Sequence, residues 1–535
     1  MKPQRPPRTI GVIGAGTMGA GIAQLACQAG AETVLHDPVP AALQNGLQTV
    51  RAGLARSEQR GRLTPAAARS AAARLLAADD LQALGDCELV IEAAPESLEL
   101  KRDLFGHLST AVVGPRCILA TNTSSLLVTA IAAGADRPER VVGMHFFNPP
   151  PVMPLLEVVA GVQSSPAALA AARAAGEAMG KHVIDAVDSP GFLVNRCHRP
   201  FGLEALRLLA ERAAAHDEID RIYRLEGRFK MGPFELMDLV GLDVGLDVAR
   251  SFYDQSFGEP RWRPSPITVR QVAAGRLGRK SGAGFYAYPS DGAAHRPPDP
   301  EPPAPGHGDG IIVVAGDSIL AEALTQAGAE AGWTMLDPTE AQSAAPPSLI
   351  LDLTGGAHDH ADPLQGGPRA LCCAGGSLAA LDQGGSAIGF NVVPPLLGAQ
   401  LVELTRGADS AQSAATATER FFATLGKHTA WVGDGPGLVL GRVVAQLANE
   451  AAFALGEGIG SAADIDAGMR LGMSYPLGPL EWADQIGLDQ VLTTLDALYE
   501  ERREERYRPA PELARRVWSG RLGLQTGEGF YAYGS

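Results

Sequence analysis

The chain has 535 residues, more than one hydrophobic core normally serves, so several domains are expected. Apolar residues make up 46% and charged residues 20%, as in folded globular proteins rather than disordered ones. The formal net charge is −15 and no lysine/arginine-rich block stands out, which argues against nucleic acid as a partner.

Six cysteines show neither zinc-site spacing nor the density of a secreted disulfide framework, which predicts buried thiols in a reducing compartment and no metal site. The first residues, MKPQRPPR, are not followed by the apolar core of a signal peptide. No apolar run reaches the roughly 18 residues of a membrane span. We therefore expect a cytoplasmic protein with no membrane partner.

Strand-like runs alternate with alanine-rich helical stretches at the start of the chain. The runs are TIGVIGAG, ETVLHD, CELVIEAA, CILATNTS, RVVGMHFF, LLEVVAG and HVIDAV. This alternation is typical of a doubly wound α/β domain, which we place over residues 1–187. From Asp188 the pattern is helical, and an all-α domain is predicted over 188–288.

The second half of the chain repeats the first. After a proline- and glycine-rich linker predicted at 289–308, DSPGFLVNR returns as DGPGLVLGR and GRLGRKSGAGFYAY as GRLGLQTGEGFYAY, at an offset of about 246 positions. A second copy of the helical domain is therefore predicted over 434–535. Residues 309–433 keep the outline of a nucleotide-binding fold without its glycine turn. They are expected to form a degenerate Rossmann-like copy.

The first strand leads into a G-x-G-x-x-G turn at Gly14, Gly16 and Gly19. Glycine lets the backbone curl tightly, lets a pyrophosphate approach, and lets the following helix pack closely on the strand. Asp37, at the end of the second strand, suits the ribose hydroxyls of a dinucleotide and repels a 2′-phosphate. These residues predict a Rossmann-type site for NAD rather than NADP.

His145 and Glu157 flank a proline-rich turn in GMHFFNPPPVMPLLE. A carboxylate partner stabilises the charged form of a histidine and fixes its ring, as a general base requires. Taken alone, His145 could equally be a core histidine that follows a strand. The dinucleotide turn upstream favours the base, because removal of a hydride from a carbinol needs one.

Polar residues also follow the strand that ends in ATNTSSL, where open α/β sheets place ligands. Asn122 and Ser124 stand there, although serine at such a place also serves as a helix N-cap. Asn195, in PGFLVNR, could likewise be a buried polar group bonded to backbone. Its counterpart in the repeat is Gly441, and Ser124 and His145 are replaced as well. This is the pattern expected if one active site was lost as a unit.

The motifs GxGxMGxGIA, VIEAAPE-x4-K, NTSSL, HFFNP-x8-E, PGFxxNR and GFYxY follow one another over the first 290 residues. In this combination the chain resembles the L-3-hydroxyacyl-CoA dehydrogenases. The resemblance implies an NAD-dependent enzyme that oxidises an acyl-CoA thioester. It implies His145 as catalytic base, Glu157 as its partner, Ser124 and Asn195 as donors to the reacting oxygen, Asn148 near the substrate, and Gly14, Gly16, Met18, Gly19, Asp37, Glu96, Lys101 and Asn122 around NAD.

The full-length layout is similar to the bacterial long forms that oxidise 3-hydroxyadipyl-CoA in phenylacetate catabolism, and to related 3-hydroxybutyryl-CoA dehydrogenases. A dehydrogenase of free hydroxy acids on the same fold is one rival, and a non-catalytic NAD-binding protein is another. In short members of this family the helical domains pair between subunits. We therefore expect an intramolecular pseudo-dimer of the two helical copies here, with a homo-oligomer also open.

Overall fold

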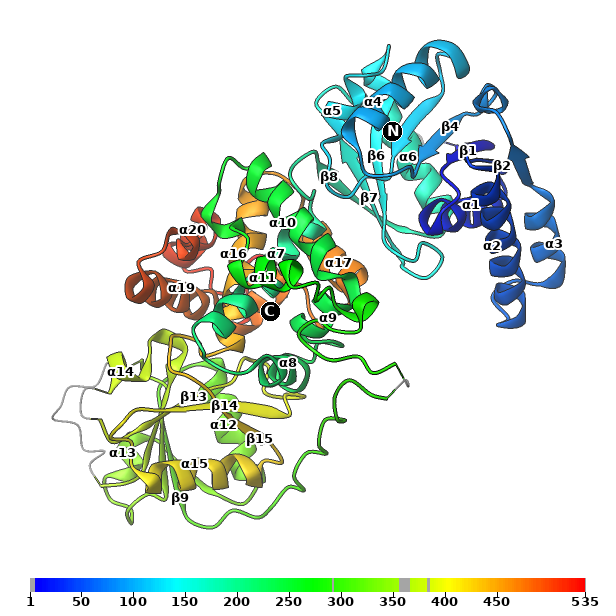
Figure 1. Ribbon diagram of the computed structural model, residues 1–535. Helices are drawn as coiled ribbons and strands as arrows, with labels where there is room; N and C mark the ends of the chain where they lie inside the picture. The colour runs from blue at the N-terminus through cyan, green and yellow to red at the C-terminus, as the bar shows by residue number, and fades with distance from the viewer. Residues whose placement is uncertain (1–4, 291–292, 356–365, 383–384, 535) are drawn as a thin grey trace. The chain divides into compact units, whose positions relative to one another are not determined.

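The computed structural model describes residues 5–290, 293–355, 366–382 and 385–534. Residues 291 and 292 of the predicted linker lie outside the described residues. The chain forms two compact units (Figure 1). Residues 1–196 and 457–473 make the first unit, and residues 197–456 and 474–535 make the second.

Within the described residues, the first unit holds an eight-stranded sheet in the order β3-β2-β1-β4-β5-β6-β7-β8. Its neighbouring strands run parallel except β6 and β7, which run antiparallel. Most of these strands are buried apolar runs, as a sheet covered by helices requires. The strands are β1 (Thr9–Ile13), β2 (Glu32–His36), β3 (Leu75–Ala78), β4 (Leu89–Glu92), β5 (Ile118–Thr121), β6 (Val141–Phe146), β7 (Leu155–Ala160) and β8 (His182–Val187).

The predicted alternation of strands and helices in this region is confirmed, and β3 is an addition to it. Its sequence, LLAA, is short and half exposed, so it carries little strand signal. Alanine-rich helices bury small residues against the sheet. The helices are α1 (Thr17–Gln28), α2 (Pro40–Gln59), α3 (Pro65–Ala73), α4 (Leu98–His107), α5 (Val128–Ala132) and α6 (Pro166–Ala178).

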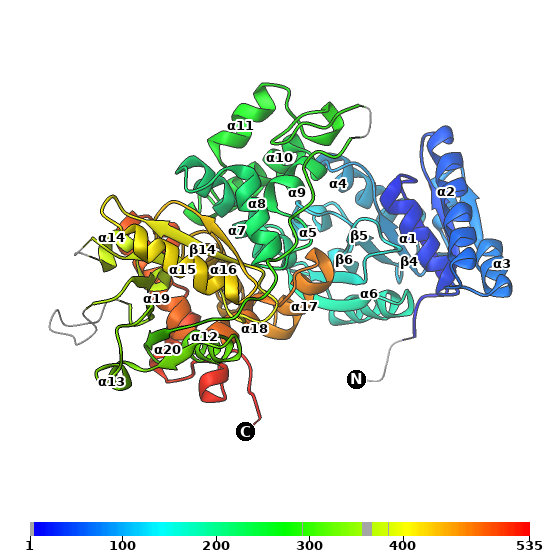
Figure 2. The same ribbon diagram turned by 90° about the horizontal axis from the view of Figure 1, so that it is seen from below.

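A further helix of the first unit comes from the end of the chain. Helix α17 (Ala462–Met473), part of the repeated helical segment, packs on β7 and β8 (Figure 2). The amide of Val187 donates to the carbonyl of Ile459 at 3.1 Å, and Arg196 pairs with Glu457 at 2.8 Å. The first unit therefore depends on a distant part of the chain.

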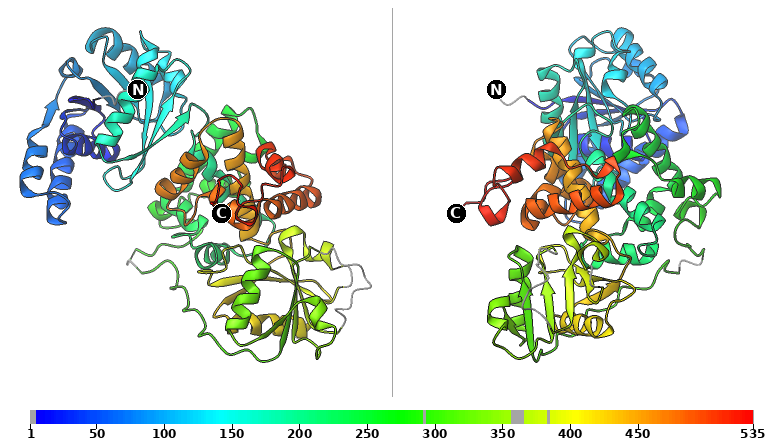
Figure 3. Two further views of the ribbon diagram at one scale, coloured as in Figure 1. Left: turned by 180° about the vertical axis from the view of Figure 1, so that it is seen from behind. Right: turned by 90° about the vertical axis from the view of Figure 1, so that its left-hand side faces the viewer.

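The second unit holds a sheet with the strand order of the first, apart from the edge strand β3, which has no counterpart among the described residues. Within the described residues it has seven strands in the order β10-β9-β11-β12-β13-β14-β15, and β13 and β14 are its antiparallel pair. Helices pack on this sheet as well (Figure 3). The elements are β9 (Ile311–Ala315), α12 (Ile319–Glu330), β10 (Thr334–Leu336), α13 (Pro338–Ala341), β11 (Leu349–Asp352), β12 (Arg369–Cys372), α14 (Leu378–Leu381), β13 (Ile388–Asn391), β14 (Leu401–Arg406), α15 (Gln412–Thr424) and β15 (His428–Trp431).

The helical segments complete the second unit. Arg442 on α16 is buried and pairs with Glu204 at 2.6 Å and with Glu211 at 2.6 Å, both from the earlier helical segment. The helices are α7 (Val194–Ala210), α8 (His216–Leu225), α9 (Pro233–Val240), α10 (Leu242–Gln255), α11 (Pro266–Ala273), α16 (Leu440–Gly456), α18 (Pro479–Ile486), α19 (Leu488–Arg502) and α20 (Pro511–Trp518).

The proline-rich segment after residue 292 is held along the second unit by polar contacts. Arg224 pairs with Asp299 at 2.8 Å, and His295 lies 2.7 Å from Glu235. The amide of Gly306 donates to the carbonyl of Thr424 at 3.1 Å. The composition of this segment indicated a linker, and these contacts tie its described part to the fold.

Candidate active site

The glycine turn lies between β1 and α1. Gly14 has φ of +95°, and a Cβ there would stand 2.5 Å from the carbonyl oxygen of Ala93. A Cβ on Gly19 would stand 1.7 Å from the carbonyl oxygen of Gly14, whereas one on Gly16 would meet nothing within 4 Å. Two glycines thus allow close backbone packing, and the third leaves open space at the start of α1. This is the cradle that a pyrophosphate needs.

Asp37 follows β2 and closes the turn. Its Oδ2 accepts from the amide of Ala15 at 2.9 Å and its Oδ1 from the amide of Val39 at 2.9 Å. The half-buried carboxylate therefore stands beside the glycine turn, where a ribose would lie. Met18, in the first turn of α1, packs against the apolar core beneath the sheet.

Lys101 and Glu96 form a charged network at the ends of β4 and β5. The ammonium of Lys101 is buried and pairs with Glu92 at 2.5 Å and with Glu96 at 3.4 Å. Glu92 was not among the predicted site residues. It also accepts from the hydroxyl of Thr121 at 2.7 Å, so it links two neighbouring strands. The only sequence signal for it was its place in VIEAAPE.

Glu96 anchors the turn that carries Ser124. It accepts from the hydroxyl of Thr123 at 2.5 Å and from the amides of Ser124 and Ser125, each at 3.1 Å. Burial raises the pKa of Glu96, but Lys101 and these hydrogen bonds outweigh it and hold the pKa below its usual value. The turn is thus fixed by an ionised carboxylate. Asn122, just before it, accepts from the amide of Phe146 at 2.8 Å.

His145 and Glu157 face each other across β6 and β7, where they are paired in register. His145 Nδ1 lies 2.6 Å from Glu157 Oε2, and both side chains are buried. Glu157 Oε1 accepts from the amides of Leu193 and Val194 at 3.1 and 3.0 Å. The Phe147 ring packs on His145 with centroids 4.6 Å apart. The imidazole is therefore held on one nitrogen, which leaves Nε2 for chemistry.

The remaining predicted residues lie near this pair. Asn195 lies at the start of α7. Its side-chain amide donates to the backbone carbonyl oxygen of Ser124 at 3.5 Å, so these two residues are in contact. Asn148 lies on the loop after β6 and is exposed. Lys181 fixes this loop, because its ammonium donates to the carbonyls of Pro150 and Met153 at 2.5 and 2.7 Å.

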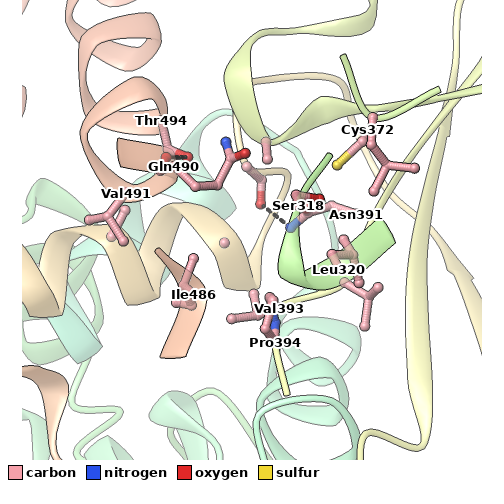
Figure 4. A pocket seen from close by; sticks show the side chains of 16 residues that line it. Ser318, Leu320, Cys372, Asn391, Val393, Pro394, Ile486, Gln490, Val491 and Thr494 are labelled. Carbon is pink, nitrogen blue, oxygen red and sulfur yellow. Dashed lines mark hydrogen bonds between the residues drawn. The ribbon is translucent and has the colours of Figure 1, made fainter. Parts of the chain in front are cut away.

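The second sheet has a different pair at the same place. Asn391 and Glu403 are opposite each other on β13 and β14, and Glu403 accepts from the amides of Val439 and Leu440, each at 2.8 Å. The side-chain amide of Asn391 donates to the backbone carbonyl oxygen of Gly437 at 3.2 Å. Asn391 lines a pocket of about 50 Å³ together with Ser318, Cys372, Gln490 and Thr494 (Figure 4).

Glu403 also meets Glu226, which follows α8. Glu226 Oε1 accepts from the amide of Val393 at 2.9 Å. Burial, and then the proximity of Glu403, raise the pKa of Glu226 well above its ordinary value. Burial also raises the pKa of Glu403, to about 7. Beside Glu157, the position equivalent to Glu226 is Gly472 on α17, which has no carboxyl group.

Among the described residues, the six cysteines are free and buried, and no cluster of three or more histidine, cysteine, aspartate or glutamate side chains could hold a metal ion. Burial raises the pKa of Cys87 and of Cys117 to about 12, and that of Cys372 to about 11. The thiols are therefore packing groups. No helix within the described residues is long and apolar enough to cross a membrane.

Two family models match the chain. The NAD-binding domain of 3-hydroxyacyl-CoA dehydrogenase matches residues 9–189, and the C-terminal domain of the same enzyme matches both 191–288 and 437–533. The repeated helical segment is therefore a second copy of one domain type.

Similar proteins include 3-hydroxyadipyl-CoA dehydrogenase of Escherichia coli strain K12, which is 35% identical and aligns over 95% of this chain and 97% of its own. A probable 3-hydroxybutyryl-CoA dehydrogenase of Deinococcus radiodurans is 41% identical over 52% of this chain and 99% of its own. Among solved structures, a 3-hydroxybutyryl-CoA dehydrogenase of Escherichia coli K12 matches with a TM-score of 0.80 and 33% identity, over 96% of this chain and 99% of that one.

The glycine turn, the buried histidine–glutamate pair and these matches agree with the expectation from the sequence. The alignments with the two Escherichia coli proteins extend over nearly the whole chain and not just its first half. The chain belongs to the 3-hydroxyacyl-CoA dehydrogenase family and is an NAD-dependent oxidoreductase of 3-hydroxyacyl-CoA thioesters.

Proposed function

We propose that His145 is the general base that takes the proton of the 3-hydroxyl group. The observation that carries this role is the buried contact of 2.6 Å between His145 Nδ1 and Glu157 Oε2. Because Nδ1 donates to the carboxylate, Nε2 is the nitrogen that accepts the substrate proton. The charge that forms on the imidazole is then stabilised by Glu157. Bound NAD supplies the hydride acceptor.

Ser124 and Asn195 are proposed as the donors that stabilise the oxygen as it becomes a carbonyl. Their support is the contact between Asn195 and the Ser124 backbone and the rigid turn that Glu96 fixes. Asn148, on the exposed loop after β6, is proposed to shape the substrate site. Gly14, Gly16, Met18, Gly19, Asp37, Glu96, Lys101 and Asn122 are proposed to surround NAD, with Lys101 acting through its two carboxylate partners.

We propose 3-hydroxyadipyl-CoA, an intermediate type in aromatic catabolism, as the substrate. Support comes from the similar Escherichia coli enzyme of that name, which matches both halves of this chain. The alternative is 3-hydroxybutyryl-CoA, favoured by the name of the full-length structural match. A steady-state panel of C4 to C8 3-hydroxyacyl-CoAs, with and without an ω-carboxylate, separates them. Preference for the C6 ω-carboxylate supports the first, and preference for the unsubstituted C4 chain the second.

We infer that residues 309–433 are a degenerate Rossmann-like copy whose role is structural. The shared strand order supports this inference, as do Asn391 in the place of His145 and Gly441 in the place of Asn195. The pocket that Asn391 lines therefore has an amide, and not a base, at that position. The proposed domains are residues 1–187, 188–288, 309–433 and 434–535, with 289–308 as the connection. The cytoplasmic location stays a prediction.

We further propose that the two helical copies form an intramolecular pseudo-dimer. The buried pair of Arg442 with Glu204 joins helices α16 and α7, one from each copy. Helix α8 of the first copy packs on β14, and α17 of the second copy packs on β7 and β8. A chain truncated after Gly308 should expose these apolar partner faces and aggregate or dimerise. A truncated chain that stays monomeric and fully active would contradict the pseudo-dimer.

A further inference from the structure

Helix α17 contacts the residues that hold the proposed base. A Cβ on Gly472 would stand 2.8 Å from Leu155 Cδ2, 3.3 Å from Phe147 Cε1 and 3.4 Å from Val194 Cγ1. Phe147 packs on the His145 ring, and the amide of Val194 donates to Glu157. The last turn of this helix therefore contacts Phe147 and Val194, and these residues in turn contact His145 and Glu157.

The repeat places a different residue at this position in the other copy. In the alignment of EIDRIYRLEG with DIDAGMRLGM, at the offset of about 246 positions, Gly472 corresponds to Glu226. Glu226 accepts from the amide of Val393, the residue at the place of Phe147, and its carboxyl meets Glu403. A carboxyl group thus faces Glu403, which has Asn391 rather than a histidine opposite it. A bare glycine faces the glutamate that partners His145.

We propose that Gly472 is a positioning residue of the first-copy active site, where its lack of a side chain lets Phe147 and Val194 hold the His145–Glu157 pair. This inference rests on the proposed role of His145 as base. A longer side chain at position 472 displaces the Phe147 ring or the Val194 side chain, because a Cβ would already stand 3.3 Å from the first and 3.4 Å from the second. Helix α17 would then help to position the His145–Glu157 pair without contacting the substrate or the reacting atoms.

The size of the effect follows from how strictly proton transfer depends on position. A displacement of about 1 Å at a catalytic group costs up to about a hundredfold in rate. The nearest atom to a new Cβ is a methyl of Leu155, which can rotate, so Gly472→Ala should stay within about twofold of the unmodified kcat. Gly472→Gln carries the side chain further into the contact and should lower kcat by about tenfold or more.

The experiment compares kcat with NAD affinity in the full-length chain. Gly472→Gln is expected to lose kcat while the Kd for NAD stays within about twofold, because the glycine turn lies elsewhere in the sheet. Gly245→Gln is the matched control, since Gly245 is an exposed helical glycine on α10 with nothing within 4 Å of a new Cβ. Glu226→Gly and Glu226→Gln should also keep kcat. Thermal unfolding shows whether each variant is folded.

The Gly472→Glu variant adds a readout that simple misfolding would not give. The charged groups near this contact include His145, Glu157 and the Arg196–Glu457 pair. An introduced carboxylate has nearly the size of the Gln side chain but carries a charge of the same sign as Glu157. At neutral pH, kcat should therefore fall further in Gly472→Glu than in Gly472→Gln, while the Kd for NAD again stays within about twofold.

Two failures are distinguishable. If His145→Gln keeps the unmodified rate, the base assignment is wrong and the positioning role falls with it. If His145→Gln is inactive but a folded Gly472→Gln keeps kcat within twofold, only the positioning role is wrong. Should Gly472→Gln unfold, the same comparison is made with Gly472→Val, whose branched side chain also exceeds the space that alanine fills; an unchanged kcat in that folded variant would overturn the proposal.

Discussion

Apart from the edge strand β3 of the first sheet, the two sheets share a strand order within the described residues, and they differ at one register position that matters for the chemistry. In the first, His145 stands opposite Glu157, and in the second, Asn391 stands opposite Glu403. Each glutamate accepts two backbone amides from the start of a helix, at 2.8 to 3.1 Å. The carboxylate site is thus a product of the fold in both places.

The comparison separates scaffold from chemistry. A lysine fixes the loop between the two antiparallel strands in both units, because Lys181 donates to Pro150 and Met153, and Lys427 donates to Leu396 and Ala399. Such repeated contacts are structural. The histidine and Asn195 occur on one side only, so they are the residues to test for catalysis.

The largest expected effect comes from removing the base. His145→Gln should lower kcat by at least about a hundredfold and by up to about ten-thousandfold, the range of general-base contributions. The Kd for NAD, measured by fluorescence titration, should barely change. The matched control is Asn391→Gln at the same register position of the second sheet, which should keep kcat. Equal losses in both variants would show that the two sites do not differ in role.

Removal of a buried ion pair tests what the second half contributes to stability. Arg442→Met should lower the free energy of unfolding by up to about 3 kcal/mol, because the buried Glu204 loses one of its ion-pair partners and keeps Arg207 and the hydroxyl of Tyr507. The exposed pair of Arg137 with Glu139 provides the control, and Arg137→Met should cost less than about 1 kcal/mol. Denaturant titration measures both. If both variants lost a similar amount of free energy of unfolding, the burial of the Arg442 ion pair would not add to its contribution to stability.

A smaller effect is expected at the cofactor turn. Asp37→Ala removes the carboxylate that would bind the ribose hydroxyls and repel a 2′-phosphate. The ratio of kcat/KM for NAD to that for NADP should fall by about tenfold, which corresponds to about 1.4 kcal/mol. Steady-state assays with both cofactors measure it. An unmodified enzyme that uses NAD and NADP equally would contradict the assignment.

The smallest effect concerns the carboxyl pair that replaces the histidine pair in the second unit. Burial raises the pKa of Glu403 to about 7, and burial and the proximity of Glu403 raise that of Glu226 well above its ordinary value, so the folded state binds a proton that the unfolded state releases. The stability of this unit should therefore fall as pH rises from about 4.5 through 7. Glu226→Gln should be a few degrees more stable than the unmodified chain at pH 8 and nearly equal at pH 5. An identical pH dependence of Tm in both chains would refute the coupling.

Much of the catalytic unit could be predicted from the sequence because its signals are local. The glycine turn is a fixed spacing, the strands are apolar runs between helices, and the antiparallel partners His145 and Glu157 flank one short turn. Each of these patterns spans about a dozen residues. Local spacing of this kind translates directly into backbone geometry.

The sequence could not reveal contacts made across the chain. Glu92, buried against Lys101, looked like any strand residue, because its burial depends on two other strands. The meeting of Glu226 with Glu403 needed the placement of α8 on β14. The repeat indicated that α17 and α8 are equivalent helices but not which sheet each would cover. Such pairings are fixed by packing between elements rather than by any one segment.

The discontinuous make-up of the first unit has a consequence for synthesis. Between Arg196 and Glu457 the ribosome must add 260 residues before α17 can reach β7 and β8. At roughly 5–20 residues per second, this takes on the order of tens of seconds. During that time the nascent sheet leaves an apolar edge uncovered, beside the turn that supplies the Leu193 and Val194 amides. The catalytic half, although translated first, is among the last parts of the molecule to be finished.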